Sequence, residues 1–290
     1  MRIITEPKSV LLVNQSKNSH MKRTSLQALT LLLAVTIFSC SSPKKSEETT
    51  GEEKVEEAAK DLGPKKYTVY KAPASYEYPD ASLEMIEPSS PLDTSETTFK
   101  FEVTNYELGI QTPDAVARGI ANSGKGQHIH FILNNDPYSA HYEPEFTKSL
   151  PEGKHVILAF LSRSYHEAVK NSSSYILKEL VVGSPDESTP SFDESAQHLF
   201  YSRPKGTYSG TDTEKLMLDF FLFNTSISPD GNKVRATING EEHMITEWAP
   251  YYIEGLEKGQ VSIKLELIDK DGNNIPGPYN TVERMVTLAE

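Results

Sequence analysis

Apolar and polar side chains alternate along three well-separated stretches of this chain. Residues 98–103, 127–131 and 261–267 each carry an apolar side chain at every second position. A period of two is typical of a β-strand with one buried face. Clusters of Asn, Asp, Gly and Pro, which favour turns, lie between the stretches. The pattern therefore predicts an all-β fold from residue 67 onward, with helix confined to short segments such as 112–121.

The second half of this strand-rich region repeats the first. Residues 133–160 align with 238–266 at an offset of 105, which rises to 106 after one insertion. The short segments that end at Asn105 and Asn224 also match, upstream of each copy. Two strand-rich copies of about 100 residues predict tandem immunoglobulin-like β-sandwich domains. The expected boundaries are a first, histidine-rich domain at 67–183, a linker at 184–200 and a second domain at 201–290.

A short apolar run at 26–38 lies near the N-terminus. It is shorter than the roughly 20 residues that a helix needs to cross a bilayer. Lys22 and Arg23 precede the run and the only cysteine, Cys40, follows it, as in a cleaved signal peptide. The segment 37–40 resembles the lipobox of bacterial lipoproteins. This resemblance implies lipid attachment to the Cys40 sulfur, whereas an ordinary secreted protein with an unmodified cysteine is the alternative.

The resemblance also divides the N-terminal region. Met21 begins a complete signal of its own, so residues 1–20 are interpreted as an upstream extension and 21–40 as the signal peptide; a start at Met1 stays open. Residues 41–66 contain many acidic and polar residues and few apolar ones, which predicts a disordered tether. Together these features predict a protein anchored by lipid to the outer membrane of the cell envelope, on either its periplasmic or its outer face.

Composition excludes several classes of function. A single cysteine cannot form an intrachain disulfide or a cysteine-rich zinc or iron–sulfur site. The net charge is −12, and it becomes −16 once residues 1–40 are removed. Such an acidic chain is not expected to bind nucleic acid, and it favours cations or proteins as partners. Residues 119–126 nearly match a phosphate-binding loop, but Gly126 replaces the required Ser or Thr, so no nucleotide is expected.

The histidines are concentrated in the first copy. His128 and His130 stand two residues apart on one expected strand, so their side chains share a face opposite Ile129 and Phe131. Two such imidazoles and a third from a neighbouring strand can hold Cu(II) or Zn(II). In the alternative interpretation the pair is exposed and His155 bonds to the backbone of a turn. The candidate ligands are His128, His130, His141, His155 and His166.

The same region carries a second resemblance. A His-x-His strand at 126–135 is followed by a Leu-Pro-x-Gly-x-His segment at 150–158. This arrangement is similar to a group of small secreted β-sandwich modules, among them domains of unknown function with immunoglobulin-like or cupredoxin-like folds. The whole chain resembles an uncharacterised lipoprotein of the Bacteroidetes type. The resemblance implies a β-sandwich fold and a place in the cell envelope.

Aromatic residues follow the His-x-His strand and recur in the matching segment of the second copy. Tyr and Trp are favoured at interfaces, where they bury a large area at low entropic cost. Burial in the hydrophobic core is the alternative. The candidate binding residues are Tyr138, Tyr142, Trp248, Tyr251 and Tyr252.

Arg163 is the remaining candidate. The segment 162–166 resembles the phosphate-binding segment of forkhead-associated domains, but the spacing between its Ser and His differs from that family's. Phosphopeptide binding and an unrecognised hydrolase are therefore minor alternatives. The principal expectation is a non-catalytic protein that binds an envelope protein or glycan through its two modules. Transition-metal binding by the first module's histidines is the second expectation.

Overall fold

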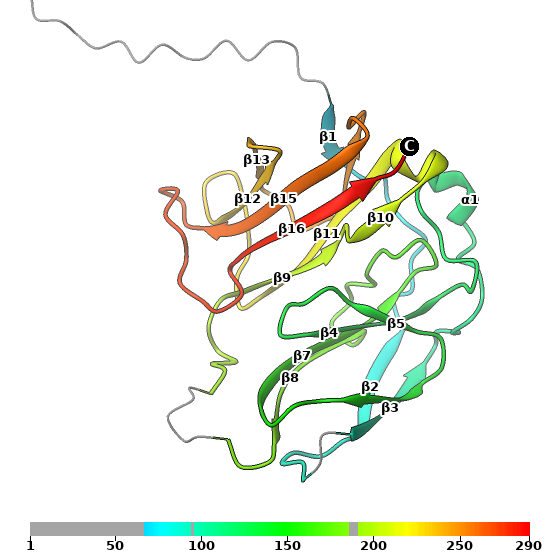
Figure 1. Ribbon diagram of the computed structural model, residues 1–290, viewed down its shortest axis with the longest axis vertical. Helices are drawn as coiled ribbons and strands as arrows, with labels where there is room; N and C mark the ends of the chain where they lie inside the picture. The colour runs from blue at the N-terminus through cyan, green and yellow to red at the C-terminus, as the bar shows by residue number, and fades with distance from the viewer. Residues whose placement is uncertain (1–66, 94–95, 186–190) are drawn as a thin grey trace, which may run out of the picture. The chain divides into compact units, whose positions relative to one another are not determined.

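A computed structural model describes residues 67–93, 96–185 and 191–290 (Figure 1). These residues form four β-sheets, which confirms the all-β prediction. In the part of the chain that the structure describes, helix is limited to one turn within the predicted segment, α1 (Ala115–Arg118), and a 3₁₀ turn, η1 (Gly210–Thr213). Within the described ranges, no helix has the length and apolar character needed to span a bilayer. The lipobox, the signal peptide and the tether lie outside the described residues.

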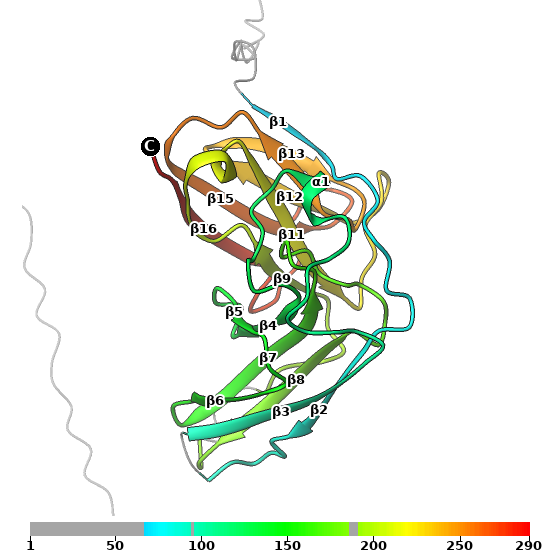
Figure 2. The ribbon, with the colours of Figure 1, turned by 90° about the vertical axis from the view of Figure 1, so that its right-hand side faces the viewer.

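The first sandwich consists of a three-stranded and a four-stranded sheet, whose two layers can be followed in Figure 2. The three-stranded sheet has the order β2-β3-β6 and the four-stranded sheet the order β5-β4-β7-β8. Phe99, Phe131 and Ile157 are fully buried between the layers, where alternation along their strands directs them. The strands are β2 (Ser82–Glu87), β3 (Glu96–Thr104), β4 (His128–Leu133), β5 (Ser139–His141), β6 (Glu145–Ser149), β7 (Gly153–Ser162) and β8 (Tyr175–Val182).

The second sandwich repeats this arrangement with one more strand in each sheet. Its sheets have the orders β1-β14-β11-β9 and β10-β16-β15-β12-β13. Phe220, Ile238 and Leu265 are among the fully buried residues of its core. The strands are β1 (Thr68–Lys71), β9 (His198–Arg203), β10 (Gly206–Tyr208), β11 (Lys215–Phe223), β12 (Lys233–Ile238), β13 (Glu241–Ile245), β14 (Tyr251–Glu254), β15 (Gly259–Ile268) and β16 (Thr281–Leu288).

Equivalent asparagines play the same part in the two copies. Asn134 and Asn239 end β4 and β12 with left-handed φ values of 51° and 49°, which asparagine tolerates better than most residues. The Oδ1 atom of Asn134 accepts a 2.9 Å hydrogen bond from the amide of Val156, and Asn239 does the same with Ser262. Each side chain thus fastens the turn after one strand to the start of the neighbouring strand.

The domain boundaries differ from the expected ones at two places. Residues 67–183 were expected in the first sandwich, but β1 pairs with β14 in the second. In addition, β9 begins at His198, inside the segment 184–200 that was expected to be a linker. The strands β1 and β14 are antiparallel in register, with Thr68 opposite Glu254. The second sandwich is therefore built from two separate parts of the chain, with the first sandwich between them in sequence.

Side chains of the two sandwiches share a third apolar cluster. It contains Leu158 and Phe160 from β7 together with Phe200 from β9 and Phe221 from β11. The faces of β4 and β7 that point away from the first core are therefore covered, and five of the six β4 residues are buried. Alternation along β4 correctly separates the two faces. The interpretation of the second face as exposed is wrong, because residues of β9 and β11 pack over it.

Candidate metal centre

Three of the five candidate histidines converge. The Nε2 atom of His128 lies 3.1 Å from Nδ1 of His166, and Nε2 of His130 lies 3.3 Å from the same atom. One ligand atom from each residue fits within a group no wider than 4.8 Å. Nitrogen ligands at Zn–N distances of about 2.0–2.1 Å in a tetrahedral site lie about 3.3 Å from one another. The two separations from Nδ1 of His166 thus match those of a tetrahedral transition-metal site, and the whole group spans at most 4.8 Å.

A tight turn brings His166 back over β4. His128 pairs with Ser162, the last residue of β7, so the chain leaves the strand beside the histidine pair. The amide of His166 donates a 2.8 Å hydrogen bond to the Arg163 carbonyl, and His166 adopts a left-handed φ of 68°. Such a conformation is uncommon for residues other than glycine and is often found at functional sites. The spacing of residues in the sequence does not predict this left-handed turn at His166.

The imidazoles are held in the form that binds metals. His128 and His130 are 0% exposed, while His166 is half-buried. Burial lowers the pKa of His128 to about 4. Burial also places the pKa of His130 and of His166 well below the usual range, and the positive charge of Arg203 acts in the same direction. At neutral pH all three rings are uncharged, as metal ligation requires.

A backbone carbonyl orients the His128 ring. Its Nδ1 atom lies 2.8 Å from the Gly126 oxygen, and because a carbonyl can only accept, Nδ1 carries the proton. The unprotonated Nε2 therefore points into the cluster. Gly126 has a φ of +87°, and a Cβ atom there would lie 2.4 Å from the Ile110 carbonyl oxygen. The loop interpreted from sequence as a failed nucleotide motif is thus a close-packed turn that supports His128.

Two hydroxyl groups also reach the cluster. The Tyr138 ring stacks on His130 with centroids 3.5 Å apart, and its Oη lies 3.3 Å from Nδ1 of His166. Ser162 Oγ lies 3.3 Å from Nε2 of His130. From β9, Arg203 Nη1 donates a 2.8 Å hydrogen bond to Tyr138 Oη. Sequence analysis missed Arg203, since it is 65 residues from Tyr138 and no pattern links the two.

The other two candidate histidines lie elsewhere. His141 stacks on Phe146 with centroids 3.3 Å apart, and its Nε2 is 2.8 Å from Ser139 Oγ. His155 is the third residue of β7, and its Nε2 lies 2.8 Å from the Pro151 carbonyl oxygen. The backbone contact that the alternative interpretation expected for His155 is present, but the residue lies in a strand rather than a turn, and neither histidine reaches the cluster.

The predicted aromatic residues do not form an exposed patch. Tyr138 and Tyr252 are buried, and the other three are half-buried. Trp248 packs beside the apolar clusters and donates its indole hydrogen to the Phe220 carbonyl over 2.9 Å. Tyr142 lies beside the metal-site residues, with its ring centroid 5.0 Å from that of His128. The core alternative therefore fits most of this set better than a contact surface.

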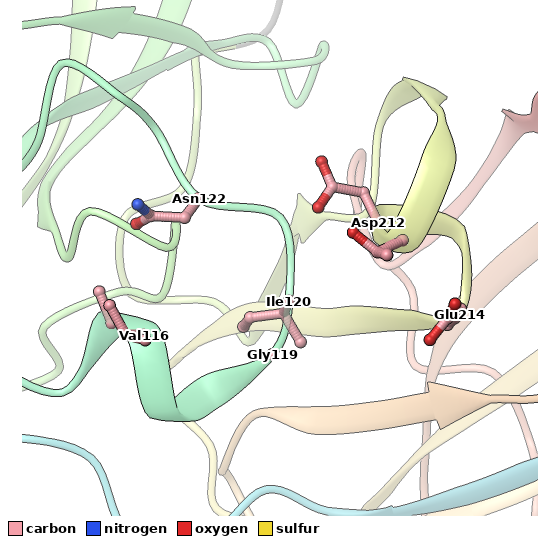
Figure 3. A pocket seen from close by; sticks show the side chains of 8 residues that line it. Val116, Gly119, Ile120, Asn122, Asp212 and Glu214 are labelled. Carbon is pink, nitrogen blue, oxygen red and sulfur yellow. The ribbon is translucent and has the colours of Figure 1, made fainter.

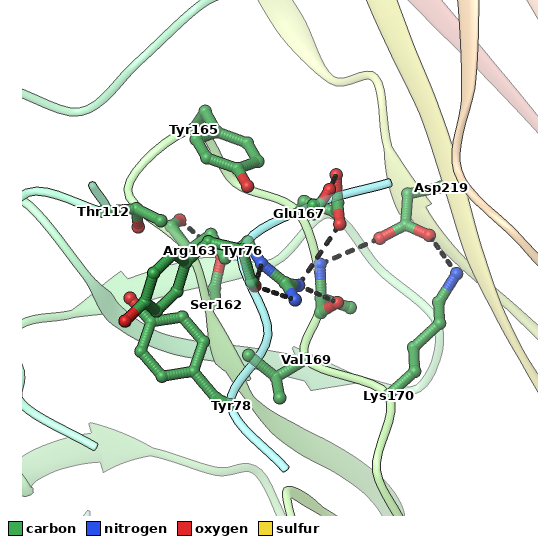
Figure 4. Close-up of polar contacts among 12 residues, drawn as sticks. Tyr76, Tyr78, Thr112, Ser162, Arg163, Tyr165, Glu167, Val169, Lys170 and Asp219 are labelled. Atoms are coloured by element: carbon green, nitrogen blue, oxygen red, sulfur yellow. Dashed lines mark hydrogen bonds and ion pairs between the residues drawn. The ribbon is translucent and has the colours of Figure 1, made fainter. Parts of the chain in front are cut away.

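Arg163 is occupied by internal contacts (Figure 4). Its guanidinium group donates to the Tyr76 and Ala168 carbonyls and pairs with Glu167 at 3.2 Å. Arg163 is buried, so it is not placed to receive a phosphopeptide. Figure 4 also shows Asp219 of β11 accepting from Lys170. Asp219 accepts from the Ala168 amide as well. These contacts join the loop after β7 to the second sandwich.

A surface cavity of about 300 Å³ lies between the α1 region and η1 (Figure 3). Val116, Ile120 and Asn122 line one side, and Asp212 and Glu214 the other. Its lining contains no histidine, cysteine or basic residue. The cavity therefore offers two carboxylates but no partner that would activate a nucleophile.

No family model and no curated protein matches the chain. Among solved structures, it is similar to the fibronectin type III-like modules of Clostridium thermocellum CbhA, with 12% identity over 71% of this chain and 94% of that one, and a TM-score of 0.26. A two-domain fibronectin type III segment of chicken tenascin shares 8% identity over 71% and 98% of the chains, at 0.19. The Bacteroides ovatus mixed-linkage glucan protein SGBP-B, solved with a heptasaccharide, shares 13% identity over 72% and 48%, at 0.19. These identities and TM-scores are too low to carry an argument. The β-sandwich assignment is based on the strand order of the sheets.

Proposed function

We propose that this chain is a lipid-anchored, non-catalytic protein of the cell envelope that binds a divalent transition metal through His128, His130 and His166. The observation that carries the proposal is the convergence of three imidazoles, two buried and one half-buried, with ligand atoms within 4.8 Å of one another. Imidazole ligands suit both zinc and copper. Cu and Zn are therefore the ions to test.

Proton counting supports a cation at this position. Nδ1 of His166 has three polar neighbours at 3.1–3.3 Å, namely Nε2 of His128, Nε2 of His130 and Oη of Tyr138. This nitrogen can carry only one proton, and Nε2 of His128 carries none. When Nδ1 of His166 is unprotonated, its lone pair faces that of His128 Nε2 in the absence of an ion. A metal ion bound by both nitrogens would remove this repulsion.

A glycan or a protein has less support than a metal ion as the ligand of this chain. An exposed aromatic patch would favour a glycan or protein surface, yet none of the five candidate aromatic residues is exposed. Tyr138 and Tyr142 instead surround the histidines. Burial of the cluster also fits a metal that is held rather than one that reacts with a large substrate, because structural sites are closed.

Calorimetric titration of the full chain, purified in detergent, with Zn(II) and Cu(II) tests the proposal. We expect one ion per chain with an affinity tighter than micromolar. His166→Ala, in a half-buried loop, and His128→Ala/His130→Ala should weaken binding at least a hundredfold. His141→Ala is the matched control and should bind as the unaltered chain does. Binding weaker than micromolar, or an unchanged affinity in both variants, would contradict the proposal.

Lipid anchoring needs its own experiment. Cys40 lies outside the described residues, so this part of the proposal is based on the lipobox resemblance. Cells that express the chain or Cys40→Ala are grown with radioactive palmitate. We expect label in the unaltered chain only, and equal labelling of the two would refute the anchor.

A further inference from the structure

We infer that Tyr138 is the fourth ligand of this metal site and that Arg203, from the second sandwich, positions its oxygen. The inference rests on the proposed metal binding by the three histidines. A tetrahedral ion bound by three imidazoles has one position left. The hydroxyl oxygens of Tyr138 and Ser162 are the candidates beside the cluster.

Geometry favours Tyr138. Its Oη lies 3.3 Å from Nδ1 of His166, the separation expected for two ligands of one tetrahedral ion. The ring is fixed by stacking on His130, with an interplanar angle of 14°. Ser162 Oγ instead donates to the Arg163 carbonyl at 3.2 Å, and no ring stacking orients its side chain. The ordered phenol is thus the better-placed oxygen ligand.

Charge gives an independent reason. Arg203 is buried at 4% exposure, and no ion pair within the described residues joins it to a carboxylate. Lys205 lies over the Tyr138 ring, with Nζ 4.1 Å from the centroid. A buried guanidinium is costly without an opposing charge. When the metal–oxygen bond forms and the phenol proton leaves to solvent, the phenolate accepts the Arg203 hydrogen bond and offsets one of the two positive charges that the ion brings.

The two sandwiches would then share the site. His128 and His130 come from β4 and His166 from the loop after β7, whereas Arg203 ends β9. Groups that orient a metal ligand typically contribute tenfold to a hundredfold to the affinity. We therefore expect Arg203→Gln to weaken binding by that factor, although Arg203 does not touch the ion.

Copper provides the test, because a phenolate bound to Cu(II) gives a charge-transfer absorption band in the visible range. The full chain is titrated with Cu(II) and followed by absorption and by resonance Raman scattering excited within the band. We expect the band and tyrosinate vibrations in the unaltered chain. Tyr138→Phe should bind Cu(II) without either signal. Tyr142→Phe, beside His128 but outside the proposed ligand set, is the control and should keep both.

The outcomes separate the two proposals. The assignment of Tyr138 is overturned, and the metal site stands, in two cases. In the first, Cu(II) binds through the histidines without a tyrosinate signal. In the second, Tyr138→Phe keeps the tyrosinate signal. If neither Cu(II) nor Zn(II) binds the unaltered chain, both proposals fail. A signal lost in Tyr138→Phe and kept in Tyr142→Phe supports both.

Discussion

The Nε2 atom of His128 and the Nδ1 atom of His166 lie 3.1 Å apart, although 38 residues separate them in the chain. One belongs to a strand and the other to a loop that returns to it through a left-handed residue. Because both rings are uncharged at neutral pH, this contact should respond both to added metal and to acid.

Zinc should stabilise the folded chain. A ligand that binds only the folded state at 100 times its dissociation constant adds about 2.7 kcal/mol to the free energy of unfolding. For a chain of this size that corresponds to a rise of about 5–10 °C in Tm. Thermal unfolding followed by circular dichroism, with and without Zn(II), measures the rise. Zn(II) should raise the Tm of His166→Ala very little. An equal rise in this variant would mean that zinc binds elsewhere.

Acid should destabilise the metal-free protein. The pKa of His128 is lowered from its usual 6.5 to about 4 in the folded state, so between these values the unfolded chain binds more protons. Stability is therefore fully present above pH 6.5 and decreases as the pH falls towards 4. Each such histidine contributes a slope of up to about 1.4 kcal/mol per pH unit.

Urea unfolding at several pH values, after treatment with a chelator, gives this slope. His128→Gln should make it shallower between pH 6.5 and 4, because the new side chain does not titrate. A slope unaffected by this change would mean that other groups dominate the pH dependence.

The contact of Asp219 with the loop after β7 should be worth several kcal/mol. Asp219 is fully buried and accepts from Lys170 Nζ at 2.6 Å and from the Ala168 amide at 3.1 Å. Removing one partner of a buried pair typically costs about 3–5 kcal/mol. Asp219→Ala should lower the free energy of unfolding by that amount in chemical denaturation.

An exposed ion pair provides the comparison. Lys270 and Asp271 are in contact, with side chains more than half exposed, and such pairs contribute about 1 kcal/mol or less. Asp271→Ala should therefore be nearly neutral. If Asp219→Ala and Asp271→Ala lower the free energy of unfolding equally, burial does not determine how much Asp219 contributes to it.

Gly126 should be needed for both stability and metal affinity. An alanine there would bring its Cβ within 2.4 Å of the Ile110 carbonyl oxygen and would have to adopt a φ of +87°. We expect Gly126→Ala to cost about 1–3 kcal/mol and, by moving the carbonyl that orients His128, to weaken Zn(II) binding about tenfold or more. Gly124→Ala, where a Cβ meets nothing within 4 Å, is the control. If both variants bind zinc alike, the Gly126 carbonyl does not support the site.

The alternation of apolar and polar residues predicted the strands, because it depends on neighbouring positions. Matching segments in the two halves predicted the repeat. Alternation placed Phe131 in the core, and the matched asparagines fasten equivalent turns. Burial of His130 could not be predicted, since it depends on packing between two copies of the repeat. The same limit applies to Arg203, which reaches Tyr138 from the other sandwich.

The pairing of β1 with β14 has a consequence for how the chain folds. Thr68 pairs with Glu254, and the whole first sandwich lies between these two residues in the sequence. The two strands can therefore pair only after that sandwich has been synthesised. Contacts so distant in sequence form slowly, because the entropy of closing the loop is lost before the contact is gained. The first sandwich is continuous in sequence and can assemble while the remainder is still being made. The earliest strand of the described chain is thus among the last to find its partner.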